Sequence, residues 1–380
     1  MSLTIATPQI RWHIGDDDKN APVQSADFHP SEPVLATGAA DSNVHLWRMS
    51  ATGQVEFIFC LSGHQKGVNV VRFSPNGDCI ASASDDGLVV VWYRNPMTTK
   101  RGWTWSGLKS ERELQRLQLR GHAEDIYDLA WSPDSRHIIS GCIDHHAIVW
   151  DVPQRVRQQT LDAHTHYVQG VAWDPRNRFV ATASVDRSCR VYARGATAKA
   201  KAKGGWQASH IINRRKFALA TALPEAETCD GVASSPAAGA PKRVPKEHRM
   251  FQDESANTCF RRPCFSPDGS LFFAPSGVFQ AAADQPQLPS VYVFASGRWS
   301  EPLAHFPALE GAKPSVAVRC CPVLFQLRKE TTEAPTMDLP YRIVFAVISV
   351  DSIVVYDTQH REPLFLVANT HYASLTDAAW

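Results

Sequence analysis

Residues 121–150 contain three runs of apolar residues separated by polar joints, and this stretch sets the pattern for the rest of the chain. The runs lie at 126–131, 138–139 and 147–150, and the first alternates apolar and polar positions as a half-buried β-strand does. The joints contain Ser-Pro-Asp-Ser and Ile-Asp-His. Proline presets φ and aspartate can bond its own backbone, so both joints favour tight turns. The stretch therefore predicts three short antiparallel strands, and a fourth is expected before the pattern starts again.

The same arrangement recurs at fixed spacings. A histidine precedes an aspartate by 22 residues three times, at 64–86, 122–144 and 164–186. An aspartate precedes a tryptophan or tyrosine by 6 residues four times, and a hydroxyl residue stands 4 residues before each of these aspartates. Short strands and tight turns that contain these residues at these fixed spacings are typical of WD40 blades, which are about 40–45 residues long. The fold class is therefore predicted to be all-β, a WD40 β-propeller.

The length of 380 residues allows seven blades with insertions, so we predict one domain over residues 1–380. Blade 7 is predicted to start at His371 and to stop at Trp380 without its two middle strands. The expected fold is thus a seven-bladed propeller with its last blade truncated at the C-terminus, in a fragment or a truncated gene model. Residues 3–13 read as a strand that completes the last blade and closes the ring.

Two segments interrupt the repeat. Residues 93–112 contain two tryptophans and mostly basic charge, and they delay the outer strand of blade 2. Residues 194–249 are rich in Ala, Lys, Pro and Ser, carry 11 basic and 4 acidic residues, and are predicted to be a disordered loop. Within them, 241–246 (PKRVPK) resembles a nuclear-import signal, although a solvated insertion without a role is the favoured interpretation.

Composition excludes several classes of protein. The net charge is +1, and no run approaches the ~18 apolar residues that a membrane span needs. The nine cysteines show no CxxC or Cys/His spacing, which favours reduced thiols over zinc sites or a disulfide framework. The N-terminus shows no signal peptide. We expect a soluble protein of the cytosol or nucleus.

The recurring His, Ser or Thr, and Asp residues could be mistaken for a hydrolase triad. A catalytic site would occur once, beside an oxyanion hole, whereas this set occurs in every well-formed repeat. We interpret it as a hydrogen-bonded tetrad that satisfies buried polar groups within each blade. The predicted tetrad residues are His64, Ser82, Asp86, Trp92, His122, Ser140, Asp144, Trp150, His164, Thr182, Asp186 and Tyr192. No catalytic, cofactor-binding or metal-binding residue is predicted, because no carboxylate or cysteine completes the nearby histidines into a tetrahedral set.

Candidate binding residues follow from strand alternation. The Gly-His turn and the Asp turn lie at the same end of a blade, so residues three and five positions after the histidine point toward one rim, the top face. The predicted partner-binding residues there are Asn69, Asp85, Asp125, Tyr127, Tyr167, Gln169 and Arg261. Tyrosines supply contact area at low entropic cost, so Tyr127 and Tyr167 are the leading candidates.

Several stretches resemble the WD40 middle subunit of chromatin assembly factor 1, the Cac2-type family. They are VNVVRFSPNGD (68–78), HAEDIYDLAW (122–131), HYVQGVAWDP (166–175), RMFQDES with CFRRPCFSPDGSL (249–271), VAVRCCPVLFQLR (316–328) and LPYRIVFAVISVDSIVVYDTQ (339–359). The last three lie in degenerate repeats, where unrelated WD40 proteins would not agree.

This resemblance implies a non-enzymatic nuclear scaffold in a histone chaperone that deposits H3–H4 on newly replicated or repaired DNA. The implied partners are a large subunit, a small WD40 histone-binding subunit, and histones H3–H4 directly or through the complex. No membrane, small-molecule substrate or cofactor is implied. Which propeller face binds which partner stays open, as does direct contact with histone.

Two alternatives remain. A Hir-type replication-independent histone chaperone has a related WD40 region, although the stretches at 249–271, 316–328 and 339–359 favour the replication-linked family. A ubiquitin-ligase adaptor would carry Trp-Asp-x-Arg after the third strand of a blade. Here 150–153 is Trp-Asp-Val-Pro, which disfavours that alternative.

Overall fold

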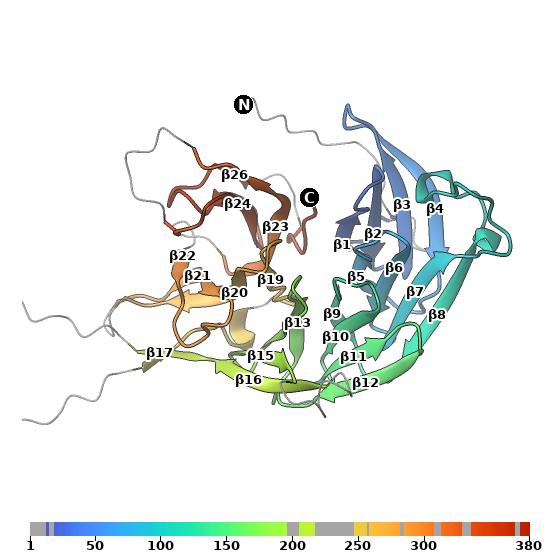
Figure 1. Ribbon diagram of the computed structural model, residues 1–380. Coiled ribbons are helices and arrows are strands. Elements are labelled where there is room, and N and C mark those ends of the chain that lie inside the picture. The colour runs from blue at the N-terminus through green and yellow to red at the C-terminus, as the bar shows by residue number, and fades with distance from the viewer. Residues whose placement is uncertain are drawn as a thin grey trace, which may run out of the picture.

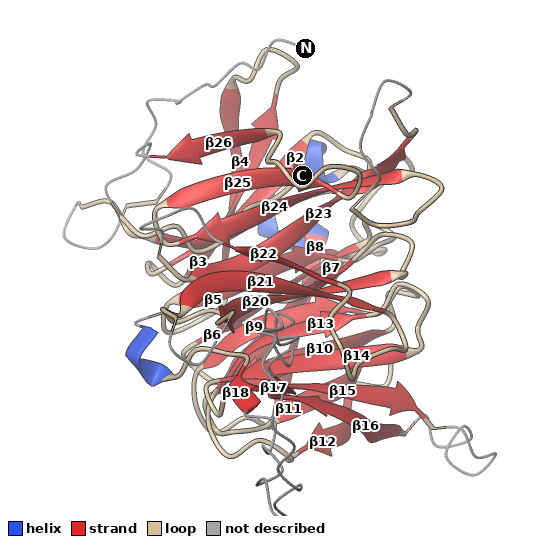
Figure 2. Ribbon diagram, turned by 90° about the vertical axis from the view of Figure 1, so that its left-hand side faces the viewer, coloured by secondary structure: helices blue, strands red, loops and turns tan. Residues whose placement is uncertain are grey.

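The computed structural model describes residues 13–14, 19–195, 205–216, 247–256, 258–281, 285–307, 313–328, 336–368 and 373–380. These residues form six four-stranded antiparallel sheets arranged as the blades of a propeller (Figure 1). Strands make up nearly all of the regular structure, with only short helical turns beside them (Figure 2). No helix of the described part is long and apolar enough to cross a membrane.

Each blade runs through four consecutive strands. Blade 1 contains β1 (Val23–Phe28), β2 (Val34–Ala39), β3 (Asn43–Met49) and β4 (Val55–Ser62), and blade 2 contains β5 (Val68–Phe73), β6 (Cys79–Ser84), β7 (Leu88–Arg94) and β8 (Leu114–Arg120). Blade 3 contains β9 (Ile126–Trp131), β10 (His137–Cys142), β11 (Ala147–Asp151) and β12 (Val156–Leu161), and blade 4 contains β13 (Val168–Trp173), β14 (Phe179–Ser184), β15 (Ser188–Arg194) and β16 (Trp206–Ile212).

The last two blades are less regular. Blade 5 contains β19 (Cys264–Phe265), β20 (Leu271–Phe279), β21 (Leu288–Ala295) and β22 (Ala304–Pro307), and blade 6 contains β23 (Ser315–Phe325), β24 (Arg342–Ser349), β25 (Ser352–Asp357) and β26 (Phe365–Ala368). A two-stranded ribbon of β17 (Arg214–Lys216) and β18 (Glu247–Arg249) lies between blades 4 and 5 in the chain. The short helical turns are η1 (Trp105–Gly107), η2 (Glu111–Glu113) and η3 (Glu254–Ala256).

The prediction of an all-β propeller is confirmed, but the prediction of seven blades with a truncated last one is wrong. Six blades are present, and residues 373–380 form no strand. They pass instead between β23 and β1 (Figure 1), where Leu375 N donates to Val350 O and Trp380 Nε1 donates to Arg319 O. The spacing of His371 and Trp380 matches the start of a repeat, yet this segment joins existing blades by polar contacts and builds no sheet.

The apolar core lies between neighbouring blades. One cluster combines Val34 and Val44 of blade 1 with Val68 and Ile80 of blade 2, and the corresponding cluster of blades 2 and 3 centres on Ile126. Burying such side chains stabilises a fold by about 1.5–3 kcal/mol each. Because both of these clusters draw on two sheets, blades 1, 2 and 3 depend on one another for burial.

The structure describes the predicted insertion at 93–112 and part of the one at 194–249. Residues 95–113 pack onto blades 1 and 2, with Trp105 and Leu108 buried in the core cluster of those blades. Within the predicted loop 194–249, residues 206–212 are the outer strand of blade 4, which the sequence had not indicated. Residues 196–204 and 217–246, and residues 1–12 of the expected closing strand, lie outside the described residues.

Candidate partner-binding surface

The tetrad residues of blades 2 and 3 are joined by hydrogen bonds across each sheet. In blade 3, His122 Nδ1 lies 2.9 Å from Asp144 Oδ2, and His122 Nε2 lies 2.8 Å from Ser140 Oγ. Trp150 Nε1 donates to the same hydroxyl at 2.8 Å. His64, Ser82, Asp86 and Trp92 repeat this arrangement in blade 2. These side chains satisfy one another, which fits a structural role.

The aspartates of these sets are held in their ionised form. Burial alone would raise the pKa of Asp144, but the hydrogen bond and charge of His122 hold that pKa well below its usual range. Asp186 is affected in the same way by His164. Burial in turn lowers the pKa of His164, although Asp186 opposes that effect.

The tetrad of blade 4 differs from those of blades 2 and 3 at its fourth residue, the aromatic one. His164 contacts Asp186 at 2.8 Å and Thr182 at 2.7 Å. Tyr192 stands where the other blades have tryptophan and is buried, but its hydroxyl makes no hydrogen bond of standard geometry with a described residue. The aromatic ring therefore fills the position without closing the network.

Blade 1 has a tetrad that the sequence pattern did not reveal. His13 Nδ1 lies 2.7 Å from Asp41 Oδ2, His13 Nε2 lies 2.9 Å from Thr37 Oγ1, and Trp47 Nε1 donates to Thr37 at 2.8 Å. His13 precedes Asp41 by 28 residues, so the 22-residue spacing of the other blades could not find it. The spacings from Thr37 to Asp41 and from Asp41 to Trp47 marked the other three members but not the histidine.

Among the described residues, two groups have the residue types and spacing to ligate a metal, and each contains the histidine and aspartate of a tetrad. Their donor atoms lie within 4.8 Å of one another at His13, Asp41 and His45, and at His122, Cys142 and Asp144. In the second group, His122 and Asp144 bond each other and the Cys142 thiol donates to Glu124 O at 3.2 Å. The same atoms are thus used for packing the blade.

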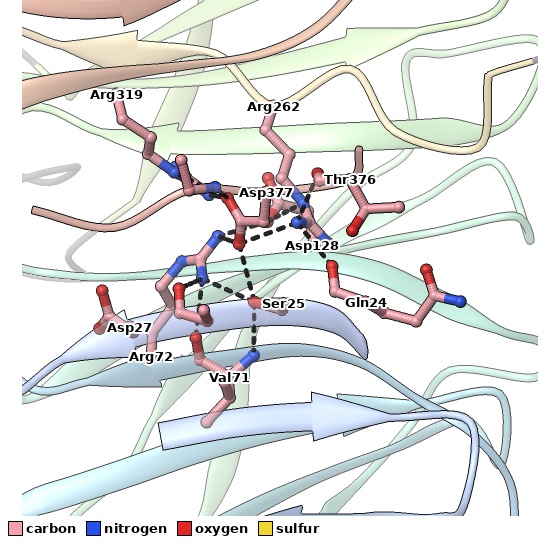
Figure 3. A network of polar contacts seen from close by, with 12 residues as sticks. Gln24, Ser25, Asp27, Val71, Arg72, Asp128, Arg262, Arg319, Thr376 and Asp377 are labelled. Carbon is pink, nitrogen blue, oxygen red and sulfur yellow. Dashed lines mark hydrogen bonds and ion pairs between the residues drawn. The ribbon is translucent and has the colours of Figure 1, made fainter. Parts of the chain in front are cut away.

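The centre of the propeller holds a network of charged side chains (Figure 3). Asp377, whose side chain is 2% exposed, accepts from Arg72 Nη2 at 2.8 Å and from Arg319 Nη2 at 2.7 Å. Arg262 Nη1 lies 2.9 Å from Asp377 Oδ2, and its Nη2 donates to Asn69 O at 2.6 Å. Arginines from blades 2, 5 and 6 therefore converge on one carboxylate.

Two further aspartates complete this central network. Asp128 Oδ2 accepts from Val171 N at 3.0 Å, while its Oδ1 lies 3.6 Å from Arg262 Nε, beyond hydrogen-bond distance. Burial raises the pKa of Asp128 and of Asp27 to about 6, against the opposing charges of the nearby arginines. The network thus joins side chains of blades 2, 3, 5 and 6 to Asp377 of the C-terminal segment.

We call the end of the propeller that carries the Asp turns the top face. Three of the predicted partner-binding residues there are used internally. Asn69 is buried and donates to Ile126 O at 3.0 Å, and Gln169 Oε1 accepts from Arg261 Nε at 3.0 Å. Arg261 is 2% exposed and also donates to Asp253 O at 2.7 Å; burial lowers its pKa to about 10. These three residues position their neighbours.

The other four predicted residues reach the top surface. Tyr167 is 40% exposed, and Tyr127, Asp85 and Asp125 are partly exposed. Burial, aided by the thiol and carboxylates around it, raises the pKa of Tyr127 to about 12, so its hydroxyl is a neutral donor. Burial and the neighbouring Asp125 and Asp86 raise the pKa of Asp85, although the Asn69 amide opposes this. The structure thus brings two tyrosines and two carboxylates together.

A shallow apolar hollow of about 300 Å³ adjoins these residues. It is lined in part by Phe260, Val316 and Leu375, and the Phe260 ring centre lies 5.8 Å from that of Tyr127. Arg262 stacks beneath Phe260, with its guanidinium carbon 4.0 Å from the ring centre. Phe260 therefore connects the aromatic surface to the central network, and the arrangement offers an apolar pocket beside negative charge.

Comparison with known proteins agrees with this architecture. Residues 3–218 and 229–380 match the model of the CAF1B/HIR1 beta-propeller domain. The chain belongs to the CAF1B/HIR1 β-propeller family. A chromatin assembly factor 1 subunit FAS2 homolog of Oryza sativa is 35% identical to it over 98% of this chain. The B subunit of chromatin assembly factor 1 of Gallus gallus is 33% identical over the full chain.

The two branches of the CAF1B/HIR1 family differ in their similarity to the chain. Protein HIR1 of Yarrowia lipolytica is 25% identical over the full chain, a lower figure than for the two chromatin assembly factor 1 relatives above. The chain spans 68% of the length of the rice relative and 64% of that of the chicken relative.

Proposed function

We propose that this chain is a non-catalytic scaffold subunit of a nuclear histone chaperone complex that deposits H3–H4 on newly replicated or repaired DNA. The similarity to the CAF1B branch of the family, across nearly all of the chain, carries this proposal. The repeated His, Asp and Ser or Thr residues support it, because in blades 2, 3 and 4 these side chains bond one another within the blade and form no single exposed reaction site among the described residues.

The proposed partners are the large subunit of the complex, its small WD40 histone-binding subunit, and H3–H4, bound directly or through the complex. The top surface suits a protein partner of basic character. Asp85 and Asp125 provide negative charge, and Tyr127 and Tyr167 provide aromatic contact area beside the apolar hollow. An apolar anchor flanked by lysine or arginine would match both features.

A pull-down from nuclear extract, read by mass spectrometry, tests this function. We expect recovery of the large chromatin-assembly subunit with H3 and H4. The double variant Tyr127→Ala/Tyr167→Ala should lower that recovery about tenfold or more, since aromatic anchors carry much of an interface's energy. Phe57→Ala, at an exposed aromatic residue of the outer strand β4, is the matched control and should not change it. Recovery of ubiquitin-ligase subunits instead would refute the assignment.

A Hir-type chaperone subunit is the second candidate, because the family model covers both branches and a HIR1 protein aligns with the whole chain. Binding assays with the purified large subunit of each complex separate the two. Selective binding to the Hir-type partner would overturn the replication-linked assignment and leave the scaffold role intact.

A further inference from the structure

The bottom face, opposite the Asp turns, carries a groove of about 790 Å³. Its walls are the loops that leave β1, β5, β7 and β11, together with the insertion at 95–113. The apolar part includes Tyr93, Trp103, Leu117 and Val152, all partly exposed. A hollow of this size holds a few side chains of a peptide.

The insertion builds one wall of this groove and holds it in place. Trp105 is 1% exposed and its Nε1 donates to Gly77 O at 2.7 Å. Both carboxylate oxygens of Glu32 accept from the backbone, from Trp105 N at 3.2 Å and from Ser106 N at 3.0 Å. Trp103 stacks edge-on against Trp105 and donates to Glu113 at 2.9 Å. The aromatic wall is therefore preformed.

Of the charged side chains that line the groove, the carboxylates have hydrogen-bond partners in the described part of the chain, whereas the two arginines do not. Glu32 is occupied by the two backbone donors, and Asp78 accepts from Asn76 Nδ2 at 2.7 Å. Arg94 and Arg155 are exposed, and neither guanidinium has an ion-pair or hydrogen-bond partner within the described part of the chain. Two cationic groups beside an aromatic floor are complementary to carboxylates that flank an apolar side chain.

We propose that this bottom groove is a second docking site, which takes an extended acidic segment of a partner protein with an aromatic or aliphatic side chain between its carboxylates. The apolar side chain enters between Trp103 and Val152, and the carboxylates pair with Arg94 and Arg155. The site is separate from the top surface, because the loops that line it lie at the opposite end of the blades from the Asp turns. It can be occupied while the top face is bound.

Fluorescence polarisation with a labelled twelve-residue peptide tests this site. The peptide consists of Glu and Asp residues interrupted by two phenylalanines. Two comparison peptides replace the phenylalanines by serine, or the acids by lysine. We expect saturable binding of the first peptide, at least about tenfold weaker binding of the serine peptide, and no binding of the lysine peptide. Hydrogen exchange should show protection of amides at 94–105 and 152–155 when the first peptide is bound.

Charge reversal at the two arginines supplies the matched variants. R94E/R155E should weaken the first peptide at least about tenfold. R101E/R157E changes the net charge equally at exposed arginines that do not line the groove, and it should bind as the unaltered chain does. Equal weakening by both double variants would refute a defined groove site. Binding of the lysine peptide would also overturn the proposal. So would duplex DNA that displaces the acidic peptide and binds more tightly than it does.

Discussion

Asp377 Oδ2 lies 2.9 Å from Arg262 Nη1, so a residue of the C-terminal segment is paired inside the ring with the inner edge of blade 5. The same carboxylate binds Arg72 and Arg319, whose side chains are only 11% and 18% exposed. Removing one partner of a buried charge pair leaves the others uncompensated, which typically costs about 3–5 kcal/mol.

Asp377→Asn should therefore lower the free energy of unfolding by several kcal/mol, on the order of 3–5. Urea titration followed by tryptophan fluorescence measures this change. Asp351→Asn removes an exposed carboxylate that lies 3.9 Å from Lys313 and should shift stability by less than about 1 kcal/mol. Equal effects of the two variants would contradict the central role of Asp377.

Replacing Asp128 should change how stability depends on pH. Its pKa of about 6 in the folded protein exceeds the ordinary value of 3.8, so the folded state binds this proton more tightly than the unfolded state. Stability contributed by that proton is present below about pH 4 and is lost as the pH rises to about 6. Asp128→Asn should therefore gain stability relative to the unaltered chain between pH 5 and pH 7.5 in thermal melts. A relative loss over that range would contradict the raised pKa.

The tetrad of blade 3 should be a source of stability. Asp144→Ala leaves His122 without its partner inside the blade and should destabilise the protein by roughly 1–3 kcal/mol. Thermal melts of Asp162→Ala provide the control, because Asp162 is exposed and directly follows the last strand of the same blade. A melting curve of Asp144→Ala that matches the unaltered protein would show that the tetrad is dispensable.

His13 and Asp41 should be energetically coupled, although they are far apart in the sequence. A double-mutant cycle of His13→Ala and Asp41→Ala is expected to give a coupling energy of about 0.5–3 kcal/mol, because the imidazole and the carboxylate share one network with Thr37. Additive effects would mean that His13 does not complete blade 1.

Sequence reasoning found the blades because their signal is local and repeated. The spacing from His122 to Asp144 and to Trp150 follows from one sheet geometry, and each copy strengthens the pattern. The number of blades could not be found in this way. The pattern of His371 and Trp380 is that of a repeat start whether the chain continues into a sheet or, as residues 373–380 do here, connects two blades through Asp377.

The candidate surface was predictable only in part. Alternation indicated that Tyr167 and Gln169 face the same rim, but it carries no information about hydrogen bonds between blades, and Gln169 proved to be held by Arg261. The central network left no repeat signal, because Arg72, Arg262 and Arg319 come from different blades and meet only in the folded ring.

The joint between blades 6 and 1 has a consequence for how the ring opens. Paired strands can separate from one end, one hydrogen bond at a time, and so fray gradually. The Asp377 segment cannot fray in that manner. When the Asp377 carboxylate leaves, three buried arginines lose their counter-ion at the same time. Opening at this joint should be an all-or-none event, and amides of β1 and β23 near it should exchange with solvent together at a single rate.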